Sequence, residues 1–228
     1  MYSVLSGDII ASTSLSKADK VLVEQNLVRL IDDLTRHFKL YGRVVKGDYL
    51  ECATPIPEHG LAVAIATKAF VKTIQINDKA YTENKSRVRL FQSYGIRVAL
   101  AYGELSRFSA EDGVMDGEAI YLSGRAISGL STHDKERVVI KNTLFFDSND
   151  EKLATHMAPI MSLLDVLLYK ATARQCEVVY HKLLGKSEDE IAQLLGINQS
   201  VVNQHSTSVG WNAIEQAVAY YHKTISDL

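Results

Sequence analysis

The chain has 228 residues, of which 46% are apolar, and its formal net charge at neutral pH is −2. This length suffices for one large domain or two small ones, and the near-zero charge excludes a general electrostatic attraction to nucleic acid or membrane. Cys52 and Cys176 lie far apart, outside any metal-ligand spacing, which favours two buried thiols in a reducing compartment. Because no apolar run approaches the roughly 18 residues of a membrane span and Met1 leads into a predicted strand instead of a signal peptide, we expect a cytoplasmic protein without a membrane partner.

The first third of the chain alternates strands and helices. Residues 2–10 are apolar and β-prone and predict a buried strand ending at Gly7-Asp8. Ser16 is placed to cap a helix over about 17–41, whose apolar residues keep a 3.6-residue period. A hairpin with a tight turn at Lys46-Gly47-Asp48 follows, and then a second helix over about 58–76.

The next segments complete a predicted sheet. A charged connection from Asp78 to Arg89 leads to a strand over 95–102, a helix over 117–130 and short strands at 137–140 and 144–147. This order predicts an α+β fold, ferredoxin-like, with an antiparallel sheet and helices on one face. The polar stretch 148–152 marks a boundary between domains at 1–147 and 156–228, and Pro159 suits the first turn of a helix.

A helix-turn-helix pattern occupies residues 188–207. Ser187 and Glu190 match a capping box at the start of its first helix, and Gly196 suits the left-handed residue that ends it. Asn198 is a candidate N-cap for the second helix, with Val202 turned inward. Such a unit usually docks its second helix in the DNA major groove, so duplex DNA is the predicted partner of an all-α C-terminal domain.

Four segments in order resemble the class III nucleotide cyclases. They are Ser6-Gly7-Asp8-Ile9, which resembles the first strand of that family, Gly47-Asp48, and the stretches 95–104 and 117–126. The resemblance covers about residues 1–147 and implies a nucleotide cyclase-like fold. It implies Asp8 and Asp48 as ligands of a magnesium ion, which prefers oxygen ligands, and Lys46 and Arg125 as nucleotide-binding residues. The alternative is that each aspartate merely stabilises its own turn.

The whole chain also resembles the SatD-type family of bacterial proteins. The residues that carry this resemblance are the Gly7-Asp8-Ile9 start, Arg174-Gln-Cys-Glu177, the segment 191–202 and Gly210-Trp211. This resemblance implies a degenerate cyclase-like domain followed by a helix-turn-helix. Members of the family usually have basic residues where this chain has Asn203 to Ser208.

The residues do not favour the cyclase reaction itself. A cyclase needs an asparagine and an arginine one helical turn apart to support the transition state; Arg125 matches, but Tyr121 stands at the asparagine position. Lys46 lies beside Asp48 instead of several residues upstream. Losing a transition-state donor typically lowers the rate about 100- to 1000-fold. We therefore expect the fold and a nucleotide-sized cleft, assign no catalytic residue, and expect a non-enzyme.

Polar side chains of the second helix are the candidate base-reading groups. Asparagine and glutamine can pair with adenine, and lysine or arginine supplies phosphate contacts. The residues from 151 to 228 nevertheless include six Lys or Arg against eight Asp or Glu, so a three-helix bundle used for dimerisation or partner binding is the alternative. The expected base contacts are Gln199, Ser200, Asn203 and Gln204, and the expected phosphate contacts are Arg174, Lys182 and Lys186.

The leading hypothesis is a DNA-binding transcriptional regulator whose cyclase-like domain serves sensing or dimerisation. One alternative is a magnesium-dependent enzyme, either nucleotide-binding or a divergent cyclase; another is a protein-interaction adaptor. We expect a homodimer, because the sheet would otherwise leave one apolar face open.

Overall fold

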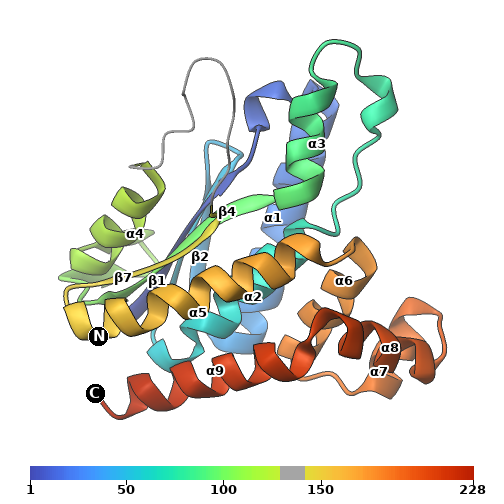
Figure 1. The fold of residues 1–228 in the computed structure, drawn as a ribbon. Coiled ribbons are helices and arrows are strands. Elements are labelled where there is room, and N and C mark those ends of the chain that lie inside the picture. The colour runs from blue at the N-terminus through green and yellow to red at the C-terminus, as the bar shows by residue number, and fades with distance from the viewer. Residues whose placement is uncertain (129–141) are drawn as a thin grey trace.

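The computed structural model describes residues 1–128 and 142–228, and a five-stranded sheet lies at its centre (Figure 1). The strands lie in the order β2-β3-β1-β4-β7. A separate two-stranded ribbon pairs β5 with β6. The strand bounds are β1 Tyr2–Ile9, β2 Tyr41–Val45, β3 Tyr49–Thr54, β4 Ile96–Gly103, β5 Arg107–Ser109, β6 Val114–Asp116 and β7 Leu144–Ser148.

Four strands of this sheet have the predicted ferredoxin-like arrangement. β1 is antiparallel to both β3 and β4, with Asp8 opposite Tyr49 on one side and Arg97 on the other. β2 and β3 form the predicted hairpin, whose turn residues Lys46 and Gly47 both have positive φ. The prediction of a wholly antiparallel sheet was wrong, because β7 pairs parallel to β4. A helical connection between these strands permits that direction, as a short hairpin could not.

Helices cover both faces of the sheet, not one face as predicted. Along β1, Leu5 joins the main core with α1 and α2, whereas Val4 packs against Ala119 of α4 on the opposite face. Ser6 also faces α4, through a 2.8 Å hydrogen bond to Ser123. The helix bounds are α1 Lys17–Phe38, α2 Gly60–Val71, α3 Lys85–Tyr94, α4 Glu118–Ser128, α5 Glu151–Lys170, α6 Ala173–Leu183, α7 Glu188–Leu195, α8 Gln199–Val209 and α9 Trp211–Ser226.

The local sequence signals predicted some helix ends correctly and others wrongly. α1 starts at the predicted cap, where Ser16 accepts a hydrogen bond from the Asp19 amide, but ends three residues early at Phe38. α3 was missed, because its charged residues resemble a connection. α5 begins at Glu151, and the carboxylate of the preceding cap residue Asp150 accepts hydrogen bonds from the Lys152 and Leu153 amides. Pro159 consequently lies inside α5 and not in the first turn of a helix. The strand predicted at 137–140 and the end of the helix predicted over 117–130 lie outside the described residues.

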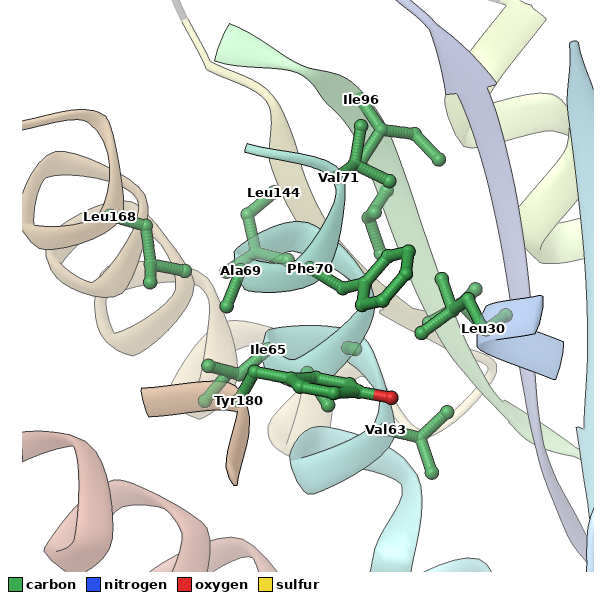
Figure 2. Packing of buried hydrophobic residues seen from close by; sticks show 14 of the residues in the cluster. Leu30, Val63, Ile65, Ala69, Phe70, Val71, Ile96, Leu144, Leu168 and Tyr180 are labelled. Atoms are coloured by element: carbon green, nitrogen blue, oxygen red, sulfur yellow. The ribbon is translucent and has the colours of Figure 1, made fainter. Parts of the chain in front are cut away.

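One apolar cluster joins the sheet to the C-terminal helices. Figure 2 shows Phe70 of α2 packed over Tyr180 of α6, with ring centroids 5.0 Å apart. Leu168 of α5 and Ile214 of α9 belong to the same cluster as Leu5 of β1. At the far end of α9, the Tyr221 and Ser3 hydroxyls share a 2.7 Å hydrogen bond. The core is therefore continuous from β1 to α9.

A buried polar network lies within this core. Lys68 of α2 is 1% exposed, and its Nζ lies 3.1 Å from Asp165 Oδ1 of α5. Asp165 accepts hydrogen bonds from the Thr143 amide and hydroxyl, at 2.5 and 2.6 Å. Burial lowers the pKa of Lys68 to about 8, although Asp165 favours the charged ammonium. Lys72, one turn further along α2, donates to the Leu168, Tyr169 and Ala171 carbonyls at the end of α5.

The helices of the described residues contain no segment that is both long and apolar enough to cross a membrane.

Candidate functional site

Asp8 and Asp48 lie at the same end of the sheet. Asp8 is the penultimate residue of β1, and Asp48 lies in the β2–β3 turn, where its carbonyl accepts a 3.0 Å hydrogen bond from the Ile9 amide. This bond ties the turn to the end of β1. The strand register therefore brings together the two aspartates that the sequence separates by 40 positions.

Each carboxylate already has a partner. Arg97 of β4 is 8% exposed, and its guanidinium lies 3.4 Å from the Asp8 carboxylate, while the Ser12 hydroxyl donates to Asp48 at 2.7 Å. Burial raises the pKa of Asp8; Arg97 opposes that rise, and the nearby Asp48 carboxylate adds to it. No local sequence pattern points to Arg97, because its proximity to Asp8 follows from the pairing of β1 with β4.

These residues do not fit a magnesium ion as they stand. A hard dication favours several oxygen ligands without a competing cation, but the Arg97 guanidinium already lies beside Asp8. Across residues 1–128 and 142–228, no group of three or more His, Cys, Asp or Glu side chains is placed to hold a metal ion. The built-in arginine supplies at this point the positive charge that a metal ion would bring.

The expected nucleotide-binding residues are not gathered around Asp8. Lys46 and Asp48 border a small cavity of about 260 Å³ next to α1, and Asp8 is not among the residues that line it. Arg125 and Tyr121 lie on the exposed face of α4, where Arg125 Nε donates to the Tyr121 carbonyl at 3.3 Å and the Tyr121 hydroxyl bonds Asp116. The opposite face of α4 is the one that contacts β1.

α6, α7 and α8 form a compact three-helix unit at one end of the molecule (Figure 1). The predicted capping box at Ser187 and Glu190 is present, and Gly196 ends α7 in the left-handed conformation at φ 62°. Asn198 occupies the cap position of α8 but makes no side-chain cap bond. A separate apolar cluster of Val178, Ile191, Ala192 and Val202, with Leu195 and Ile197 beside it, holds the three helices together.

The outward face of α8 carries the four expected base contacts. Gln199, Ser200, Asn203 and Gln204 are all exposed, and Val202 is fully buried behind them. Two of the four are engaged with an acid of α7: Glu188 Oε2 lies 2.6 Å from Gln199 Nε2 and 3.4 Å from Asn203 Nδ2.

Glu188 also holds one of the expected phosphate contacts. Its other carboxylate oxygen lies 2.9 Å from Lys182 Nζ, which is 5.2 Å from the centre of the Trp211 ring. The hydrogen bond from Lys182 lowers the pKa of Glu188. No local sequence pattern points to Glu188 as a site residue, because the turns on either side of α7 bring its partners to it.

The other two expected phosphate contacts lie in different surroundings. Arg174 pairs with Glu177 at 2.7 Å on α6. Lys186 borders a cavity between α1 and α6–α7 that His37 and His181 also line. The three basic residues thus have three different sets of neighbours.

Comparisons with known proteins yield a distant likeness to solved structures alone. No protein-family model matches the chain, and no curated protein matches it either. A solved structure of a bacterial light-regulated adenylyl cyclase aligns with a TM-score of 0.42 and 12% sequence identity. The alignment covers 64% of this chain and 42% of that one, so this chain spans less than half the length of the cyclase structure. The SatD-type assignment stays a prediction.

Proposed function

We propose that the chain is a DNA-binding regulator that reads duplex DNA with α8. The observation that carries this proposal is the composition of the exposed face of α8: four uncharged polar side chains stand outward, and the helix contains no Lys, Arg, Asp or Glu. Gln199 and Ser200 occupy the first turn, which reaches furthest into a major groove when a second helix docks there. Asn203 and Gln204 follow one turn later.

The chemistry of these side chains suits adenine. An asparagine or glutamine amide can pair with adenine through two hydrogen bonds, and each such pair gives about 1–3 kcal/mol of discrimination. Phosphate contacts are assigned to Arg174, Lys182 and Lys186. To contact a DNA phosphate, Lys182 must break its ion pair with Glu188. To contact a base, Gln199 and Asn203 must break their hydrogen bonds to the same carboxylate. Glu188 therefore acts in this proposal as the internal competitor of DNA.

The test is selection of bound sequences from a random duplex pool, followed by mobility shift. We expect a Gln199→Ala, Asn203→Ala double variant to lose the selected sequence. The matched control is Asn212→Ala, Gln216→Ala, which removes two exposed amides from α9 and should bind as the unmodified chain does. Equal retention of the sequence by both variants would assign the three-helix unit to protein contacts and favour the adaptor alternative.

Glu188→Gln gives a second, oppositely signed test. It removes a negative charge from the proposed DNA face and releases Lys182, Gln199 and Asn203. We expect tighter binding and a steeper salt dependence, since one more lysine becomes available to phosphate. Weaker binding in this variant would contradict the role given to Glu188.

The sheet part is assigned sensing or dimerisation in the same proposal. The observation that bears on its chemistry is the Arg97–Asp8 contact, which disfavours a magnesium-dependent reaction. The enzyme alternative is tested by a magnesium- or manganese-dependent turnover of ATP or GTP that Asp8→Ala abolishes. Its detection would replace the regulator proposal for this part of the chain.

A further inference from the structure

A cavity of about 580 Å³ separates α1 from α6 and α7. α1 contributes Arg29, Asp33, Arg36 and His37 to its wall, and the C-terminal helices contribute His181 and Lys186 among others. The volume lies within the range of small-molecule sites, which is about 300–1,000 Å³. This cavity is distinct from the aspartate pair at the end of β1.

The charges in the cavity are unbalanced. Asp33 is already engaged by two partners, since Arg36 pairs with its Oδ1 at 2.5 Å and the Tyr180 hydroxyl donates to its Oδ2 at 3.0 Å. Glu177, the other carboxylate in the wall, pairs with Arg174. In the part of the chain that the structure describes, Arg29 and Lys186 take part in no ion pair. Among the described residues, two cations thus face the cavity without an ion-pair partner, although the Glu190 carboxylate lies near Lys186.

Burial first, and this excess of positive charge second, lower the pKa values of the histidines in the wall. Burial and the nearby Lys186 ammonium lower the pKa of His37. Burial first, and then Lys186, lower the pKa of His181 to about 4, with Arg29 acting in the same direction and Asp33 opposing. The His181 Nδ1 atom is buried and has no hydrogen-bond partner among the described residues.

We propose that this cavity binds a phosphorylated small molecule with an apolar or ring-shaped body. Arg29 and Lys186 hold the phosphate, since charge-assisted hydrogen bonds from guanidinium and ammonium groups are the strong contacts of phosphate sites. Leu184, Leu194 and Leu195 line the cavity as well, and they supply the surface for the body of the ligand. A bound ligand bridges α1 to α6–α7 and so fixes the three-helix unit against the sheet part.

The test is calorimetric titration of the full chain with inorganic phosphate, phenyl phosphate and AMP, and with adenosine as the uncharged counterpart of AMP. We expect the two phosphomonoesters to bind, inorganic phosphate to bind more weakly, and adenosine not to bind. Arg29→Gln with Lys186→Gln should weaken the phosphomonoesters by about tenfold or more, because each removes a charge-assisted bond. The matched control is Lys17→Gln with Lys223→Gln, two exposed lysines elsewhere, which should leave the affinities unchanged.

A second variant and a second readout guard against a folding defect. Leu194→Glu places a carboxylate at a residue that is already 56% exposed and should also abolish binding while all the cations remain. In a nuclear magnetic resonance titration, the pKa of His181 should rise when a phosphomonoester is added. The proposal is overturned by the absence of binding of all three phosphates at millimolar concentration, or by equal losses in the cavity and control variants. It does not depend on DNA binding, since no DNA is present in these titrations.

Discussion

Replacing Asp165 with asparagine removes the carboxylate that lies 3.1 Å from the buried ammonium group of Lys68. With a pKa of about 8, Lys68 is charged at pH 7, and its charged form is favoured there by about 1 kcal/mol over the neutral form. The variant loses this stabilisation of the charged form of Lys68, because an amide does not balance the ammonium charge. It also weakens the two hydrogen bonds from Thr143, at a further cost of about 1–2 kcal/mol. We expect the free energy of unfolding to fall by about 2–3 kcal/mol in total.

The assay is urea unfolding followed by circular dichroism at pH 7 and pH 9. In the unmodified protein the folded-state pKa of Lys68 lies below the unfolded value of about 10.4, so the unfolded state binds more protons above pH 8 and stability rises there. In the variant Lys68 is neutral when folded, and the same rise begins at lower pH. The difference between the two proteins should therefore shrink between pH 7 and pH 9.

Asp78→Asn is the control for Asp165→Asn. It breaks the Asp78–Arg89 pair, in which the arginine side chain is 61% exposed, and such surface pairs contribute about 0–1 kcal/mol. The role given to Asp165 is contradicted if Asp165→Asn lowers the free energy of unfolding no more than Asp78→Asn does, or if it lowers it equally at pH 7 and pH 9.

Four further outcomes are expected. The free energy of unfolding should fall as the pH drops from 6.5 to 4, because His181 takes up a proton in the unfolded state, whereas burial and Lys186 keep its pKa at about 4 in the folded state. Urea unfolding of His181→Gln should show a smaller fall over the same pH range, and an equal fall would contradict the role given to His181. Gly60→Ala should destabilise the protein by about 1–3 kcal/mol, because the added carbon would lie 2.6 Å from Ser3 Cβ, whereas Gly124→Ala has nothing within 4 Å and should be neutral or stabilising in the same assay. α4 covers the sheet face whose exposure was the reason for expecting a dimer; light scattering tests the dimer directly, with twice the chain mass expected, and a monomer at micromolar concentrations would count against it. ATP and GTP should show little or no cyclase turnover with magnesium or manganese when pyrophosphate release is followed, and a rate that Asp8→Ala removes would overturn that expectation.

The local features of the fold could be predicted from the sequence. The β2–β3 turn follows from Lys46-Gly47, and the start of α7 follows from Ser187 and Glu190, because short-range bonds decide both. The α4 helix was also predicted, but not its face of the sheet. The face that α4 covers depends on which helices pack against Leu5 on one side of β1 and which pack against Val4 on the other.

The contacts that change the chemistry could not be predicted in this way. Arg97 reaches Asp8 through strand register, and Lys68 reaches Asp165 across two helices that are nearly a hundred positions apart in sequence. Glu188 gathers Lys182, Gln199 and Asn203 only after two turns have formed. Sequence patterns show residue types and local spacing, but these three sets of contacts are decided by how distant segments of the chain pack together.

The bond between Ser3 and Tyr221 joins positions 218 residues apart, and the two marked ends of the chain lie near each other in Figure 1. Contacts of such separation carry a large loop-closure cost and slow folding. During synthesis, β1 leaves the ribosome long before α9, so the contact between Ser3 and Tyr221 can form only after α9 has been made. We therefore expect a nascent chain stalled before α9 to expose the surface around Ser3 and to be a preferred substrate for chaperones.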